Sequence, residues 1–185
     1  MKIRRIFLVA LLGPMLVTAQ VPESAEKAEK VPDTGSIESP ILSLELRDQY
    51  GNTNSLLRQR GGAVVVVVVG VRRLSMIERW ERDLSQRVPG IRFLNVADLP
   101  DDAPVDAGRT AATLRKRVPD GVPVLMDLDR RWATSYALDT ALPHLLVFDA
   151  QGRLLARFRG RWTDELGAQV ASTVPRSVLG GEPAT

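Results

Sequence analysis

The sequence predicts an α/β domain whose central sheet is covered on both sides. The strongest observation is the run Ala63–Val69, in which one alanine precedes six consecutive valines. β-Branched residues favour a strand, and the lack of polar alternation indicates that both faces are buried. A helical pattern over 75–88 and a strand–turn–strand pattern over 145–160 supply further elements. Because open α/β sheets bind ligands beyond the carboxyl ends of their strands, we expect a site just after Val69.

The first 19 residues are typical of an export signal. A basic segment over 2–5 precedes the apolar stretch 6–17, and small residues predict cleavage after Ala19. A retained membrane anchor is the alternative, but the apolar stretch is shorter than the roughly 20 residues that a membrane span needs. We therefore expect an exported protein, periplasmic or secreted, with no stable membrane insertion after cleavage.

The rest of the chain divides into three parts. Residues 20–40 mix Glu, Lys, Ser, Pro and Ala, and we predict that they form a disordered tether. Residues 41–175 carry the strand and helix patterns and are predicted to form one domain. Residues 176–185 are predicted to be a flexible tail.

Composition excludes several kinds of function. The sequence has 25 Lys and Arg against 22 Asp and Glu, and three of the basic residues lie in the predicted signal, so the remainder is neutral. A neutral chain gives no electrostatic reason to expect nucleic acid as a partner. The chain has no cysteine and one histidine, so a site of His and Cys ligands cannot form within it, and we expect neither a metal nor another cofactor.

Local patterns predict the elements around the valine run. Residues 41–46 alternate apolar and polar side chains, which is typical of a strand, and 54–60 form at most a short helical turn. In the helix over 75–88, Ser75 and Glu78 match a capping box. The helical spacing predicts a buried face formed by Ile77, Trp80, Leu84 and Val88. It also predicts two ion pairs on the opposite face, Glu78–Arg82 and Asp83–Arg87.

The second half of the chain alternates strands with helices. Two helices begin with a residue whose side chain suits an N-cap, Asp106 and Thr163. The sequence Asp-Ala-Gln-Gly at 149–152 is typical of a hairpin turn. In chain order we predict a strand (91–96), a helix (106–118), a short strand within 122–128, a helical turn (129–136), a strand (145–148), its hairpin partner (153–160) and a helix (163–174).

The late part of the chain carries motifs of a known family. They are the segment Val122–Asp127 (Val-Pro-Val-Leu-Met-Asp), the segment Leu142–Arg153 with its proline, hydrophobic run and Asp-x-x-Gly, and Gly160 after the last strand. Together with the order of the elements, they resemble the thioredoxin-like redoxins and the alkyl hydroperoxide reductase/thiol-specific antioxidant proteins. The resemblance implies a thioredoxin-like fold, with a mixed central sheet flanked by helices.

The resemblance also assigns a role to a proline. In that family the proline matching Pro143 is cis and faces the active-site cysteines, and the residue matching Leu142 presents backbone groups to an extended substrate. The resemblance therefore implies a cis peptide bond before Pro143. The sequence by itself leaves open an ordinary trans proline that opens a strand.

The redox pair of that family is missing from this chain. It sits between the central strand and the first helix, where this sequence has Arg72 and Ser75 near the matching positions. Thiol–disulfide exchange and peroxide reduction by cysteine both need a thiolate. Because the chain has no cysteine, the activity of the family does not carry over to it.

Two arginines make the loop after the valine run a candidate anion site. Arg72 and Arg73 precede a helix N-terminus, which attracts anions, and their guanidinium groups suit a carboxylate or a phosphate. Val71, Leu142 and Pro143 would form the walls of such a pocket. The alternative is a pair of solvated side chains, which is common for arginine at surfaces.

Ser75 and His144 are a second candidate pair. A serine nucleophile needs a base, and His144, the one imidazole, adjoins the proline expected to face this loop. The capping box already accounts for Ser75, and no Gly-x-Ser-x-Gly motif supports catalysis. We therefore expect no catalytic residue.

These observations predict an exported, non-redox binding or scaffold module. A protein or peptide partner in the cell envelope would lie across Val71–Leu74 and Leu142–Pro143 and pair with the backbone of Leu142. One alternative is a redoxin-related antioxidant enzyme that works through a partner's thiols. Another is a structural part of an envelope complex, in which the last strand carries the contacts. The basic side chains of that strand would suit an acidic partner or, as the alternation of Leu154, Ala156 and Phe158 favours, form a solvent face that opposes strand-to-strand aggregation: Arg153, Arg157, Arg159 and Arg161.

Overall fold

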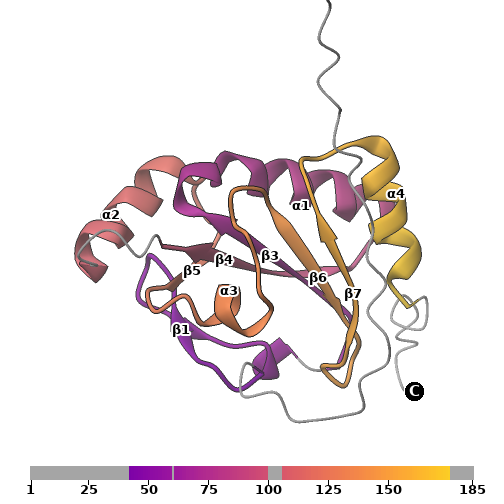
Figure 1. Ribbon diagram of the computed structural model, residues 1–185, viewed down its shortest axis with the longest axis horizontal. Helices are drawn as coiled ribbons and strands as arrows, with labels where there is room; N and C mark the ends of the chain where they lie inside the picture. The colour runs from indigo at the N-terminus through magenta and orange to yellow at the C-terminus, as the bar shows by residue number, and fades with distance from the viewer. Residues whose placement is uncertain (1–41, 60, 100–105, 176–185) are drawn as a thin grey trace, which may run out of the picture.

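The computed structural model of the protein describes residues 42–59, 61–99 and 106–175 (Figure 1). The predicted signal, tether and tail lie outside these residues, so those three assignments stay predictions. No helix in the described ranges has the length and hydropathy needed to cross a membrane.

A mixed sheet of five strands forms the centre of the domain. Its order is β5-β4-β3-β6-β7. Strands β3, β4 and β5 are parallel to one another, whereas β6 is antiparallel to β3 and β7 is antiparallel to β6. The strand bounds are Val64–Gly70 for β3, Arg92–Asp98 for β4, Val124–Asp127 for β5, His144–Phe148 for β6 and Leu154–Arg159 for β7. The predicted α/β class and its mixed central sheet are confirmed.

The valine strand β3 is buried on both faces, as predicted. Alternate valines belong to two hydrophobic cores on opposite faces of the sheet: Val65, Val67 and Val69 to the first, and Val64, Val66 and Val68 to the second. Each of the six is at most 1% exposed. Because burial of one valine side chain stabilises a fold by roughly 1.5–3 kcal/mol, this strand anchors both cores.

Helices cover the two faces of the sheet unequally (Figure 1). Three helices lie along the face of the first core: α1 (Ser75–Arg87), α2 (Ala107–Arg117) and α4 (Asp164–Thr173). The face of the second core carries the short helix α3 (Arg131–Ser135), the hairpin of β1 (Leu46–Arg47) and β2 (Thr53–Asn54), and the 3-10 turn η1 (Leu57–Gln59). A further 3-10 turn, η2 (Val71–Arg73), connects β3 to α1.

The first predicted strand is much shorter than expected. Side chains over 42–47 do alternate between half-buried and exposed, but only Leu46–Arg47 pair as a strand, with Thr53–Asn54. Leu42 instead packs against the second core, and its carbonyl accepts a hydrogen bond from the N–H of Leu57 at 2.8 Å. The alternation therefore reflects burial against the domain rather than membership of the sheet.

The start of α1 differs from the predicted capping box. Turn η2 runs directly into the helix, Leu74 already has helical angles (φ −54°, ψ −34°), and no side chain caps the end. Ser75 is therefore inside the helix and not at its N-cap. The predicted Asp83–Arg87 pair is also wrong, because Arg87 instead binds the carboxylate of Asp164 in α4 at 2.7 Å.

Other local predictions are confirmed. Asp106 caps α2 by accepting a hydrogen bond from the N–H of Arg109 at 2.9 Å, and Thr163 caps α4. The hairpin turn closes through the N–H of Gly152 and the carbonyl of Asp149 at 3.0 Å. The buried face of α1 contains its predicted residues: Ile77, Trp80 and Leu84, with Val88 just after the helix.

Glu81 of α1 provides a test of this packing. Its carboxylate accepts a hydrogen bond from the side-chain amide of the buried Asn95 at 2.7 Å, and burial raises its pKa above the usual 4.5. The folded state thus binds the carboxyl proton of Glu81 more tightly than the unfolded chain does. The contribution of Glu81 to stability therefore falls as the pH rises from the unfolded pKa through the higher folded pKa. We expect Glu81→Gln, which keeps the acceptor oxygen, to increase the free energy of unfolding at neutral pH. Urea unfolding across pH 4–7 measures this.

Glu78→Gln is the matched control for that experiment. Glu78 lies on the same helix but is exposed, and its ion pair with Arg82 at 3.9 Å is of the kind that contributes little. The control should change the free energy of unfolding by less than about 1 kcal/mol. A Glu81→Gln variant that is less stable than the wild type at neutral pH would show that the carboxylate is stabilising.

Candidate functional site

Two segments that are far apart in the sequence meet at the end of β3. Val68 of β3 pairs with His144 of β6, and the N–H of Gly70 donates to the carbonyl of Thr140 at 3.3 Å. The approach is close, since a Cβ on Gly70 would lie 2.9 Å from that carbonyl oxygen. The loop before Pro143 therefore lies beside the segment that follows the valine strand.

A buried carboxylate holds this arrangement in place. Asp98, at the end of β4, is 3% exposed and accepts hydrogen bonds from the hydroxyl of Thr140 at 2.5 Å and from Nε of Arg130 at 3.1 Å. Asp127, at the end of β5, accepts from the first two N–H groups of α3 at 2.9 and 2.7 Å, and burial raises its pKa. In the described part of the chain, no three His, Cys, Asp or Glu side chains are placed to hold a metal ion.

The first predicted segment of the site forms turn η2 and the start of α1. Arg72 and Ser75 are exposed, Val71 and Arg73 are half-buried, and Leu74 is buried. The two arginines are thus within reach of solvent on a loop that borders the Gly70–Thr140 contact. Binding of an anion by them stays a prediction.

The second predicted segment precedes β6. Leu142 is half-buried, and within the described residues neither its N–H nor its C=O forms a hydrogen bond. Pro143 is buried, and its carbonyl accepts from the N–H of Gly160 at 2.9 Å. The described ranges contain no cis peptide bond, so the cis proline implied by the resemblance is wrong. Pro143 instead opens β6 as a trans proline, at a position where its missing N–H is tolerated.

Ser75 and His144 are not joined by a hydrogen bond in the described ranges. His144 is 8% exposed, and its Nε2 lies 2.9 Å from the carbonyl oxygen of Asp139. A carbonyl can only accept, so Nε2 carries a proton and donates. Burial lowers the pKa of His144, which keeps the ring neutral near pH 7. The imidazole thus binds the backbone, and the structure gives no support to a nucleophile–base pair.

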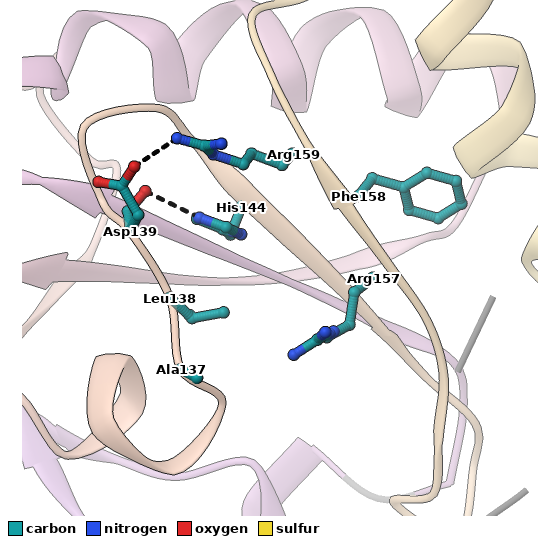
Figure 2. Close-up of a pocket in the computed structure, with 7 residues that line it drawn as sticks. All are labelled: Ala137, Leu138, Asp139, His144, Arg157, Phe158 and Arg159. Carbon is teal, nitrogen blue, oxygen red and sulfur yellow. Dashed lines mark hydrogen bonds and ion pairs between the residues drawn. The ribbon is translucent and has the colours of Figure 1, made fainter. Parts of the chain in front are cut away.

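His144 also lines a hollow that the sequence did not predict. The hollow has a volume of about 240 Å³ and lies between the loop 137–139 and strands β6 and β7 (Figure 2). Its lining consists of Ala137, Leu138, Asp139, His144, Arg157, Phe158 and Arg159. The alternation of Arg157 and Arg159 along the last strand was a partial signal, but no local pattern shows that the loop carrying Asp139 folds over them.

The arginines of the last strand bind groups of their own chain. Three such contacts are Arg153 with the Asp149 carboxylate at 2.7 Å, Arg157 with the carbonyl of Tyr136 at 2.8 Å, and Arg159 with the Asp139 carboxylate. A partner that approached β7 would compete with these contacts. The alternative in which this strand carries the contacts of an envelope complex stays a prediction.

Comparison with solved structures identifies the fold. The chain is similar to Etrx1, an exposed lipoprotein thioredoxin of Streptococcus pneumoniae, with a TM-score of 0.59 and 16% identity over 71% of this chain and 98% of that one. It is also similar to DsbF of Mycobacterium tuberculosis, with a TM-score of 0.52 and 16% identity over 72% of this chain and 96% of that one. A third similar structure is a candidate thiol:disulfide interchange protein DsbE of Chlorobium tepidum. Its TM-score is 0.50, and its sequence is 16% identical over 84% of this chain and 99% of that one.

No protein-family model and no curated protein matches the sequence. At 16% identity, the likeness to solved structures shows the fold and not the activity. The chain thus has the thioredoxin-like fold of the redoxins, and it has this fold without a cysteine at any position of its sequence.

Proposed function

We propose that this chain is a non-redox binding module that holds an extended peptide at the end of β3. The peptide would lie across Val71–Leu74 and Leu142–Pro143. One observation carries this proposal: in the described ranges the N–H and C=O of the half-buried Leu142 have no hydrogen-bond partner, although strand pairing begins two residues later. Extended peptides bind by pairing with such backbone groups.

The chemistry of the neighbouring side chains supports a role without redox chemistry. Arg72 and Ser75 stand near the positions where the resemblance places a redox pair, and neither can form a thiolate. The two loops still meet through Gly70 and Thr140. A peptide-facing surface without a redox cysteine suits binding of a peptide rather than thiol chemistry. The guanidinium groups of Arg72 and Arg73 would add a preference for an acidic group, or for a small anion, beside the peptide.

A location in the cell envelope is part of the same proposal. The predicted signal over 1–19 supports export, and Etrx1, which has the same fold, is an exposed lipoprotein. The peptide partner would then belong to another envelope or secreted protein.

Peptide selection followed by NMR tests the proposal. Heptapeptides selected from a random library on the chain lacking residues 1–19 should shift the amide resonances of Val71–Leu74 and Leu142 and leave those of the turn at 149–152 unchanged. Methylation of the peptide nitrogen that pairs with Leu142 should weaken binding about two- to tenfold, as expected for one hydrogen bond. Amide shifts confined to β7 would instead favour the alternative in which the chain is a structural part of an envelope complex.

A second candidate is a redoxin-related enzyme that works through a partner's thiols. It is favoured by the fold, which the chain shares with the candidate interchange protein of Chlorobium tepidum. Turnover of a hydroperoxide by the purified chain, supplied with a dithiol, would support this candidate and would count against the binding module.

A further inference from the structure

We propose that the hollow between β6, β7 and the loop 137–139 is a binding site for a single carboxylate. It goes beyond the peptide surface proposed above and shares no residue with Val71–Leu74 or Leu142–Pro143. Figure 2 shows His144 and the pair of Asp139 and Arg159 on one side of the hollow and Arg157 on the other, whereas the ring of Phe158 points away.

Strand geometry directs three basic side chains to the same place. His144 pairs with Arg159, and Leu146 pairs with Arg157, so these residues share one face of the sheet. Ala156 and Phe158 alternate with the arginines and belong to the core on the opposite face. The guanidinium groups of Arg157 and Arg159 therefore lie on the face of β7 that borders the hollow.

The walls hold these groups in place. The Nη1 atom of Arg157 donates to the carbonyl of Tyr136 at 2.8 Å, and Arg159 forms an ion pair with Asp139. The backbone carbonyl of Asp139 accepts from His144, so the loop is tied to both strands. Oriented guanidinium groups bind a planar carboxylate through two parallel N–H donors.

Charge and size favour a carboxylate over a larger or more highly charged anion. Arg157 and Arg159 are positive, Asp139 is negative, and the buried His144 is neutral because burial lowers its pKa. The lining therefore has a net positive charge that one carboxylate balances. A phosphate dianion would place excess negative charge beside Asp139. The volume of about 240 Å³ is below the roughly 300–1,000 Å³ of most ligand pockets, so a small acid or one acidic side chain fits.

Asp139 occupies the position that such a ligand would take on Arg159. The side chains of this pair are 64% and 46% exposed, and pairs of this kind contribute little to stability, so an incoming carboxylate can displace Asp139. Asp139→Asn removes the competing charge. It keeps the backbone carbonyl that binds His144 and the side-chain oxygen that accepts from the N–H of Ala141 at 3.1 Å.

Titration of the chain lacking residues 1–19 tests this site, with binding followed by NMR in a buffer free of other carboxylates and of phosphate. The probes are acetate, for a free acid, and acetyl-Ala-Glu-Ala-amide, for an acidic side chain. We expect Asp139→Asn to tighten binding of at least one probe by about two- to fivefold. Arg159→Gln and Arg157→Gln should each weaken it by about fivefold or more.

Arg161→Gln is the control of equal charge change, since Arg161 follows the strand outside the hollow. Unchanged affinity in Asp139→Asn, or an equal loss in Arg161→Gln and Arg159→Gln, would overturn the proposal. Tighter binding of inorganic phosphate than of both carboxylates would overturn the ligand class. These results do not depend on the heptapeptide experiment, whose shifts lie at Val71–Leu74 and Leu142.

Discussion

Trp80→Ala is expected to lower the free energy of unfolding by about 3–5 kcal/mol, the range for removal of a fully buried aromatic side chain. Trp80 is 0% exposed and meets the ring of Trp162 edge-to-face, with 4.7 Å between the ring centroids. Trp162 in turn covers Gly167 of α4, where a Cβ would lie only 2.1 Å from the indole ring. Trp80 thus joins α1 to α4, and its loss leaves a cavity between two helices. Urea unfolding followed by circular dichroism measures the change.

Two variants calibrate that result. Trp80→Phe keeps an aromatic ring and removes an indole N–H that has no hydrogen-bond partner in the described ranges, so it should lose clearly less stability than Trp80→Ala. Leu57→Ala removes a side chain that is 39% exposed and should change stability by less than about 1 kcal/mol. Equal losses in Trp80→Ala and Leu57→Ala would contradict the packing described for the first core.

Asp98→Ala is expected to have the second largest effect, a loss of about 2–4 kcal/mol. Breaking a fully buried ion pair removes 3–5 kcal/mol, and the value here is lower because the side chain of Arg130 is 29% exposed. The substitution also leaves the hydroxyl of Thr140 without its acceptor. Since Thr140 is the residue whose carbonyl binds Gly70, the loop should move away from β3.

Two measurements separate the local effect of Asp98→Ala from general destabilisation. The amide hydrogen of Gly70 should exchange faster with solvent, whereas the amides in the middle of β3 should change only with global stability. Thr140→Val keeps the Asp98–Arg130 pair and removes one hydrogen bond, so it should lose about 1 kcal/mol. If Asp98→Ala leaves the exchange of Gly70 unaltered, Asp98 does not position this loop.

Patterns that depend only on neighbours along the chain could be predicted from the sequence. Six valines in a row specify a buried strand whatever surrounds them, and the spacing of Ile77, Trp80 and Leu84 specifies the buried face of a helix. The N-caps Asp106 and Thr163 are equally local, because each side chain binds an N–H three residues ahead.

Features that depend on tertiary partners could not be predicted in this way. Ser75 matches a capping box, but turn η2 makes the chain helical before it. Arg87 has an acid one helical turn away and instead binds Asp164, which the fold brings close from the far end of the chain. The same reason hid the role of Asp98 and the pairing of Asp139 with Arg159, since both contacts join distant segments.

A strand made of one residue type cannot specify how it lines up with its neighbours. If β3 slid by two positions, valines would still face both cores, so hydrophobicity alone does not oppose such a shift. Correct alignment must come from groups that are not interchangeable. Asn95 lies opposite Val67 and reaches Glu81, and Gly70 fits against Thr140 where a side chain would not. The register of the valine run is thus set by Asn95 on the neighbouring strand and by Gly70 at the end of β3 itself.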